Sequence, residues 1–272
     1  MQIGLSQIGF SINEILCLIT LATGTCWFTW RLRLARLPSP PTKKPLWVSF
    51  GAELFLVAGL MFTCRVAVAD WPKVPSGSME PTLRVGDYLL VNHLAYGPRL
   101  PFTNTAIEFG QPQRGDVVVF RFPLDVSQFY VKRLVGVPGD SVEFRDGTVT
   151  VNGAAFDIEH LGDGTLQEDR GQWLVRETAG GAPHELKINP FVQGRMPMPN
   201  MQATGVAQNC RIERPAAWHC TVPADHYLML GDNRDGSSDF RVWGFLPKAE
   251  VYGKAVRVLF NLSDMKRAWT AL

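Results

Sequence analysis

The chain has 272 residues, enough for one substantial core or for one core together with a membrane anchor. It is 46% hydrophobic and 19% charged with a formal net charge of +2. Its basic residues do not gather on a motif-bearing segment, so the sequence indicates no nucleic-acid partner. The first 70 positions are strongly apolar, whereas the remainder has the composition of a soluble β-rich protein. The sequence thus predicts two parts that lie in different solvents.

The first apolar stretch runs from about Ile8 to Trp30, and Glu14 is its only charged residue. It ends in Trp27 and Trp30, a placement typical of aromatic residues at a membrane–water interface. Basic residues follow this stretch instead of preceding it, which is the reverse of a cleavable signal peptide. We therefore expect an N-terminal segment and a first transmembrane helix in residues 1–30.

A second apolar stretch, Leu46 to Ala69, predicts a second transmembrane helix in residues 46–70. Glu53 and Arg65 leave an uncharged centre of eleven residues. A charge costs roughly 2.5–3.5 kcal/mol at the bilayer midplane and far less near an interface, and this stretch is long enough to place both charges toward its ends. Its last residues, Ala67-Val68-Ala69, also have the small-x-small form of a cleavage site, so self-processing after Ala69 is a further hypothesis.

Residues 31–45, which connect the two stretches, form a basic loop without an acidic residue. Short loops rich in Lys and Arg stay in the cytoplasm. The N-terminus and everything after Trp71 are therefore expected on the extracytoplasmic side. A soluble protein with two buried helices is the alternative, but it explains neither the tryptophans nor the basic loop. The basic residues of the loop are Arg31, Arg33, Arg36, Lys43 and Lys44.

From Trp71 onward, β-branched or aromatic runs bounded by Gly, Pro or Asp predict short strands. Asp146-Gly147 separates two alternating runs and predicts a hairpin. No helical period of useful length appears, so the expected fold class is mainly β with antiparallel sheets. The expected strands are Asp87–Asn92, Asp116–Phe122, Tyr130–Val137, Ser141–Phe144, His226–Leu230 and Val251–Phe260.

Residues 154–220 are rich in Gly, Pro and polar residues, and we expect a small subdomain inserted between two parts of one β core. Those parts are residues 71–153 and residues 221–272, the second of which ends in a solvated tail. Cys210 and Cys220 lie ten residues apart just before a predicted strand. We predict a disulfide between them, which requires an oxidising compartment; two reduced thiols are the alternative.

A candidate nucleophile lies in the run Pro75-Ser76-Gly77-Ser78-Met79-Glu80-Pro81-Thr82-Leu83. Two serines around a glycine, between prolines, predict a tight loop with an exposed hydroxyl, although a plain polar turn has the same pattern. A serine needs a base to become a nucleophile, and the chain has no GxSxG elbow. A Ser–His–Asp triad is not excluded, but none of the histidines lies in a conspicuous polar motif. These histidines are His93, His160, His184, His219 and His226.

Lys132 is the other candidate base, because it interrupts an apolar strand, where lysine is uncommon. Burial disfavours the charged amine and can lower its pKa by several units, so that a neutral amine could take the proton of Ser78. From this strand alone, a lysine that points to solvent remains an equal alternative. A literal SxxK at Ser263–Lys266 lies in the charged tail and is explained by chance.

The run Gly231 to Pro247 places two arginines, three aspartates and two serines in one predicted loop, with the sequence GDNRDGSSDFRVWGFLP. A calcium-type or purely structural loop is the alternative to a catalytic one. Arg234 and Arg241 lie among the acids and argue against a cation site.

Together these runs resemble the bacterial signal peptidase I family. PSGSMEPTL is similar to its nucleophile motif, RGDVVVFRFP (114–123) to the next strand motif, YVKRLVGVPGD (130–140) to its lysine motif, and the run from Gly231 to its final motif. The resemblance covers roughly residues 71–140 and 221–260 and the two-anchor topology. The middle insertion matches only in being a variable region.

The resemblance implies that Ser78 is the nucleophile and Lys132 the general base. It implies that the Ser76 hydroxyl and the Ser78 backbone N–H form the oxyanion hole, and that Ser237 hydrogen-bonds the Lys132 amine. Two supporting ion pairs are also implied, and they are Asp232 with Arg133 and Asp239 with Arg241. The family fold is a core of coiled antiparallel β-sheets with a small inserted domain, and it uses no metal or organic cofactor.

The implied substrates are the signal peptides of exported preproteins, cut after small residues at positions −1 and −3. The substrate would add as a strand beside two segments of the core. The implied location is the bacterial inner membrane, with the catalytic part on the periplasmic side and the export translocon as a neighbour. The substrate-binding residues implied are Val74, Pro75, Phe129, Tyr130 and Val131.

Two alternatives keep part of this interpretation. A specialised Ser–Lys peptidase that matures one pilin would use the same chemistry, and a substrate panel distinguishes the two. An inactive membrane-anchored β module that binds exported peptides would need neither Ser78 nor Lys132.

Overall fold

The computed structural model describes residues 12–37, 39, 45–97, 107, 109–145, 147–163, 171–178, 183–189, 198–214 and 217–272. The chain divides into two compact units. One unit contains the described residues up to Asp70, together with Gly97 and Ile107. The other contains Trp71–Tyr96 and the described residues from Phe109 to the C-terminus, and it includes Ser78 and Lys132.

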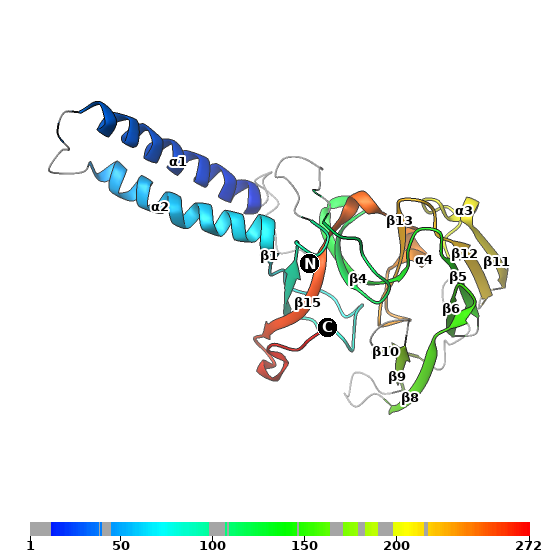
Figure 1. The fold of residues 1–272 in the computed structure, drawn as a ribbon. Coiled ribbons are helices and arrows are strands. Elements are labelled where there is room, and N and C mark those ends of the chain that lie inside the picture. The colour runs from blue at the N-terminus through cyan, green and yellow to red at the C-terminus, as the bar shows by residue number, and fades with distance from the viewer. Residues whose placement is uncertain are drawn as a thin grey trace. The chain divides into compact units, whose positions relative to one another are not determined.

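Two helices, α1 (Ile12–Arg36) and α2 (Leu46–Thr63), form most of the first unit (Figure 1). They pack on each other through aromatic rings, with the centroids of Trp27 and Phe55 5.7 Å apart. A π-helical turn (Cys64–Val68) and the short strand β1 (Ala69–Asp70) follow α2. Both helices are long and apolar enough to cross a membrane. Of the two charged residues in the second predicted span, Arg65 is paired, because its Nη2 lies 2.8 Å from Asp70 Oδ1.

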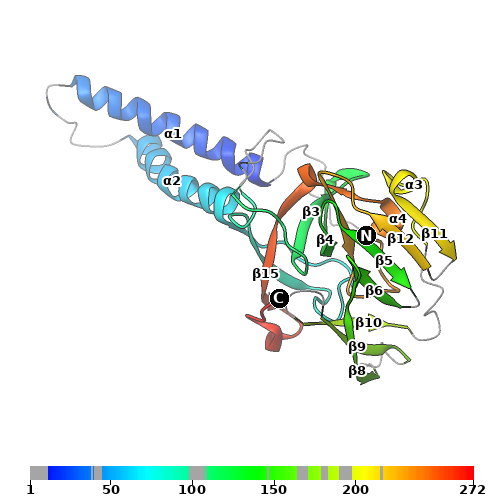
Figure 2. The same cartoon turned by 45° about the vertical axis from the view of Figure 1, so that its right-hand side comes forward.

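The main sheet of the second unit has the strand order β2-β15-β3-β4-β13-β14, with antiparallel neighbours throughout. Figures 1 and 2 show β15 as a long strand, and it pairs with β2 on one side and with β3 on the other. The strands are β2 (Asp87–Asn92), β3 (Val117–Phe122), β4 (Asp125–Gly136), β13 (His226–Leu230), β14 (Leu246–Pro247) and β15 (Val251–Asn261). The predicted mainly β, antiparallel class is therefore confirmed.

A second sheet has the order β11-β12-β5-β6-β7. The predicted pairing of the two runs is confirmed, since β5 pairs with β6 and Arg145 faces Thr148, while Asp146 of the predicted turn lies outside the described residues. Cys210 and Cys220 face each other on β11 and β12 and are joined by a disulfide. The strands are β5 (Ser141–Arg145), β6 (Thr148–Val151), β7 (Ala154–Ala155), β11 (Cys210–Arg214) and β12 (Ala217–Thr221).

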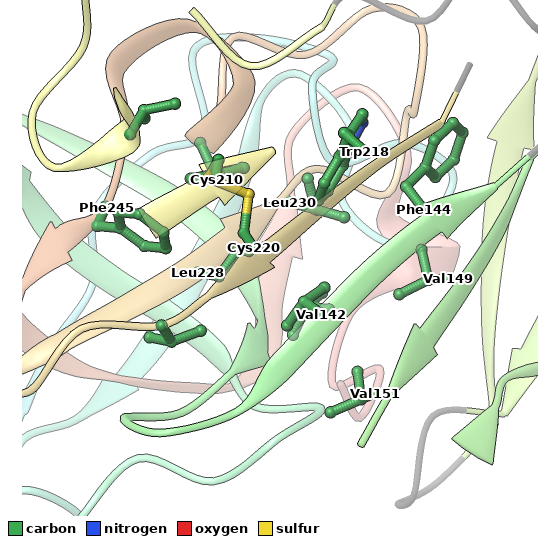
Figure 3. Packing of buried hydrophobic residues seen from close by; sticks show 14 of the residues in the cluster. Val142, Phe144, Val149, Val151, Cys210, Trp218, Cys220, Leu228, Leu230 and Phe245 are labelled. Atoms are coloured by element: carbon green, nitrogen blue, oxygen red, sulfur yellow. A yellow bond between two sulfur atoms is a disulfide. The ribbon is translucent and has the colours of Figure 1, made fainter. Parts of the chain in front are cut away.

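The core of this second sheet includes residues from the expected insertion. Figure 3 shows the disulfide among buried side chains, with Trp218 and Phe144 on neighbouring strands. The rings of Trp218 and Phe144 stack with centroids 5.5 Å apart. Residues 210–221 thus contribute strands and core side chains to the same sheet as residues 141–155.

A small third sheet consists of β8 (Asp157–Asp163), β9 (Trp173–Thr178) and β10 (His184–Ile188), in the order β10-β9-β8. Figure 2 shows it apart from β5, β6, β11 and β12. Val175, Leu186 and Ile188 form its own apolar cluster. The short helices α3 (Val206–Asn209) and α4 (Phe240–Trp243) and the 3₁₀ turns Lys248–Glu250 and Met265–Arg267 complete the unit.

Two expectations about element limits need correction. β4 begins at Asp125, before the predicted Tyr130, because its first residues extend the ladder with β3 as far as Phe122 opposite Asp125. The C-terminal segment is not a solvated tail. Its backbone lies along β15, where Val258 N donates to Thr270 O at 2.8 Å.

Candidate active site

Ser78 lies in the loop that precedes β2. The fully buried side chains of Met79 and Leu83 anchor this loop in the apolar cluster beneath it. Leu83 N donates to Met79 O at 2.9 Å, which closes a turn directly after Ser78. The apolar cluster thus fixes the position of the loop. Ser78 is buried, with 9% of its surface exposed.

Lys132 reaches Ser78 from β4. Its Nζ donates to Ser78 Oγ at 2.6 Å and to Val131 O at 3.1 Å. The residue is 3% exposed, so of the two orientations that the sequence left open the buried one is found. Burial lowers the pKa of Lys132 to about 8, and the carboxylates of Asp239 and Asp232 oppose this shift only in part. A minor fraction of the amine, far larger than for an ordinary lysine, is therefore neutral near neutral pH.

A cavity of about 550 Å³ opens beside Ser78. The nucleophile loop forms one wall, and residues 128–132 of β4 form another. Leu89 and Val119 contribute apolar surface, and Ser76 lies at the site with its Oγ 3.4 Å from Ser78 Oγ. The predicted site residues that line this cavity are Val74, Pro75, Ser76, Ser78, Phe129, Tyr130, Val131 and Lys132.

One edge of β4 is open at the cavity. Residues 129–131 pair with β3 on one side, where Val131 faces Val119. On the other side, β13 pairs with β4 only between Arg133 and Gly136. Among the residues that the structure describes, no strand covers that second edge at 129–131. An extended peptide can add there by backbone hydrogen bonds.

Both predicted ion pairs are present and buried. Arg133 binds Asp232 with two hydrogen bonds, Nε to Oδ1 at 2.8 Å and Nη2 to Oδ2 at 2.6 Å. Arg241 binds Asp239 in the same bidentate way, at 2.8 and 2.7 Å. Asp239 also accepts from Gly231 N at 3.1 Å. The Arg133–Asp232 pair thus fixes the strand that carries Lys132 to the loop after β13, and the Arg241–Asp239 pair lies within that loop.

The hydrogen bond expected between Ser237 and Lys132 is not formed. Ser237 Oγ is buried and bonds to none of the residues that the structure describes. It lies against Gly231, where an added Cβ would collide with it. The Lys132 amine is directed to Ser78 and to the Val131 carbonyl instead.

The sequence analysis missed two residues that hydrogen-bond to groups of this site. Thr82 Oγ1 donates to Asp232 Oδ2 at 2.5 Å and so joins the nucleophile loop to the Arg133–Asp232 pair. Asn233 lines the cavity and donates to two backbone carbonyls of the nucleophile loop. Asn233 stands in the conspicuous run from Gly231, which was the one available signal.

In this mainly β unit, a serine hydroxyl is bonded to a buried amine, and a cavity with an open strand edge lies beside it. This combination is typical of a serine peptidase. The model of the family described as "Signal peptidase, peptidase S26" matches residues 47–260. This chain belongs to that family, and the resemblance read from the four motifs is confirmed.

Several proteins similar to this chain are described as signal peptidase I. Signal peptidase I of Pseudomonas aeruginosa is 37% identical over 238 residues, which cover 82% of this chain and 76% of that protein. Signal peptidase I of Pseudomonas fluorescens has the same identity and the same shares. Signal peptidase I of Aquifex aeolicus is 31% identical over 225 residues, covering 77% of this chain and 82% of that protein.

Proposed function

We propose that this chain is a membrane-bound serine endopeptidase that removes N-terminal signal peptides from exported preproteins, with Ser78 as nucleophile and Lys132 as general base. One observation carries the proposal: a buried lysine amine lies 2.6 Å from a serine hydroxyl at the wall of a peptide-sized cavity. Family membership supports the reaction class.

The reaction begins when neutral Lys132 takes the proton of Ser78 as the oxygen attacks the carbonyl carbon at the cleavage site. With a pKa of about 8, about one tenth of the amine is neutral at pH 7. The oxyanion is bound by the Ser78 N–H and the Ser76 hydroxyl, and losing one such donor costs on the order of 10²–10³ in rate. The Lys132 ammonium then protonates the leaving amine. Lys132 next activates a water that hydrolyses the acyl ester.

The substrate lies as an added strand between the open edge of β4 at Phe129–Val131 and the Val74–Pro75 segment. Alternate side chains of a strand point to the same face, so the residues at −1 and −3 enter the cavity together. Leu89 and Val119 limit the apolar space there. This arrangement supports a preference for small residues at both positions.

Membrane attachment uses residues 1–70, with the basic loop at 31–45 in the cytoplasm and the catalytic unit on the periplasmic side of the inner membrane. Two features support this orientation. Residues 31–45 carry five basic residues and no acid, and three of the five, Arg31, Arg33 and Arg36, lie at the end of α1 and not in a loop. The Cys210–Cys220 disulfide is typical of an oxidising compartment. On that face the enzyme would meet preproteins beside the export translocon.

The test is cleavage of purified preproteins by the full chain in detergent. Ser78→Ala, Lys132→Ala and Lys132→Arg should each abolish cleavage while the fold is retained, because a guanidinium does not deprotonate in the working range. Substantial activity of Lys132→Ala would rule out the lysine base. A panel of several preproteins and one pilin decides the substrate class, since cleavage of the pilin alone would overturn the general role.

A further inference from the structure

The peptide bond between Gly77 and Ser78 carries the N–H that the proposed oxyanion hole uses. A trans peptide is planar, and its C=O and N–H point in opposite directions. Fixing the Gly77 carbonyl therefore fixes the direction of the Ser78 N–H. Asn233 binds this carbonyl, with Nδ2 donating to Gly77 O at 3.1 Å. Its backbone N donates to the next carbonyl, Ser78 O, also at 3.1 Å.

Asn233 is itself held from the small third sheet. Lys187 of β10 forms a parallel bridge with Asn233. Lys187 N donates to Asp232 O at 2.9 Å, and Lys187 O accepts from Arg234 N at 3.0 Å. Both chain neighbours of Asn233 are thus bonded to one residue of β10. The Lys187 amine also reaches the nucleophile loop, with Nζ 2.9 Å from Glu80 Oε2.

A buried ion pair fastens the same loop to β9. The Arg234 guanidinium donates to both carboxylate oxygens of Glu177, at 3.1 and 2.5 Å, and both side chains are at most 2% exposed. His184 Nε2 lies 3.3 Å from the same carboxylate. Burial raises the pKa of Glu177, but Arg234 and His184 outweigh it and hold that pKa at about 2. The carboxylate is therefore charged throughout the working range.

We infer that the sheet β8–β10 is a positioning element for the oxyanion hole, in which Glu177 holds Arg234 and thereby places Asn233 against the Gly77 carbonyl. This inference rests on the proposed function. Neither Glu177 nor Asn233 reacts. Each acts through the Gly77–Ser78 peptide. Through Glu177, the sheet β8–β10, which lies within residues 154–220, has a role in the reaction.

The test compares two variants of the full chain with matched controls. Asn233→Ala removes the amide that binds Gly77, and its control Asn209→Ala removes an amide that donates to another glycine carbonyl, Gly205 O, at 2.8 Å. Glu177→Gln removes the negative charge and one of the two oxygen acceptors that hold Arg234. Its control, Glu159→Gln, breaks an exposed ion pair with Arg176 in the same sheet.

Asn233→Ala and Glu177→Gln should each lower kcat by about 10- to 100-fold, less than the loss of a whole oxyanion donor. KM and the pH midpoint of the rate should stay unchanged, as should all constants of the two controls. Affinity for a peptide aldehyde, whose adduct with Ser78 places its oxygen in the oxyanion hole, should fall in parallel with kcat. Affinity for an uncleaved peptide of the same sequence should not.

Glu177→Gln leaves a buried guanidinium without its carboxylate and can fail to fold, so circular dichroism accompanies each assay. In that event Glu177→Gln/Arg234→Met, which buries no unpaired charge, carries the test of the sheet. Wild-type kcat in Asn233→Ala would overturn the inference. So would equal losses of aldehyde and peptide affinity, which indicate a general deformation. The proposed function is tested separately, because it fails if wild type does not cleave preproteins or if Ser78→Ala or Lys132→Ala still does.

Discussion

Replacing Lys132 by methionine should change the pH dependence of stability in a direction that the burial of this amine dictates. The folded pKa is lowered from an ordinary 10.5 to about 8. Below pH 8 the amine is charged in both states, and the folded state bears the full cost of burying it. Between pH 8 and 10.5 the unfolded chain binds more protons, so wild-type stability rises with pH. Above 10.5 the cost is gone.

The size of this effect follows from the two pKa values. Each unit of difference between the folded and the unfolded pKa changes the free energy of unfolding by about 1.4 kcal/mol. The cost of burying the charged amine is therefore about 3 kcal/mol. Methionine has a similar length and no charge, so the variant lacks this cost at every pH. The lost hydrogen bonds to Ser78 and Val131 subtract about 1 kcal/mol each without following the same titration. The informative quantity is therefore how the difference between variant and wild type changes with pH.

The assay is thermal unfolding of both proteins from pH 6 to pH 10, followed by near-ultraviolet circular dichroism. About 3 kcal/mol corresponds to roughly 6–12 °C in Tm for a unit of this size. The Tm of Lys132→Met relative to wild type should be highest at pH 6–7 and should fall by about this amount toward pH 10. A constant difference would refute the lowered pKa, and a difference that grows with pH would refute its sign.

Two further predictions concern stability away from the cavity. Arg267→Ala should destabilise the catalytic unit by about 3 kcal/mol, because it leaves the buried carboxylate of Asp87 without its bidentate partner. Thermal melting measures this, and the exposed neighbour Lys266→Ala should melt like wild type. Cys210→Ser/Cys220→Ser should lower stability by about 2–3 kcal/mol, as expected for a closed loop of about ten residues. Titration of wild type with a thiol reagent, denatured without reductant, should find three thiols and not five.

Short-range patterns were sufficient to predict much of the fold. Residues 87–92 and 226–230 form strands with the predicted limits, because alternation and flanking turn residues are local properties. The pairing of β5 with β6 was predictable because a hairpin signal is also local and consists of two turn residues. The position of Lys132 beside Ser78 needed more than periodicity. Only the ordered motifs joined two residues that lie 54 positions apart.

Long-range partners could not be predicted from the sequence. The contact of Asn233 with Gly77 spans 156 positions and depends on how β10 and the loop after β13 meet. Arg267 lies in the segment that was expected to be a solvated tail, yet it binds Asp87 across 180 positions. Ser237 was assigned by motif alone, and the motif does not determine in which direction its hydroxyl points.

The same limit applies to residues 154–220. Their composition indicated an insertion, but composition does not show which strands pair. β12 pairs with β5, with Trp218 opposite Phe144, and therefore contributes to a core that is mostly built by other segments. Among the described residues of this range, only β8–β10 form a sheet of their own.

The pH dependence of kcat/KM for a purified preprotein tests the central claim most directly. Wild type should show a rate that rises with pH through a midpoint near 8, where Lys132 loses its proton. Lys132→Ala and Ser78→Ala should both lose at least about 10³-fold in rate across the whole range. Loss of activity in Ser78→Ala alone, with Lys132→Ala active and its midpoint unmoved, would contradict the account and assign the base to another group.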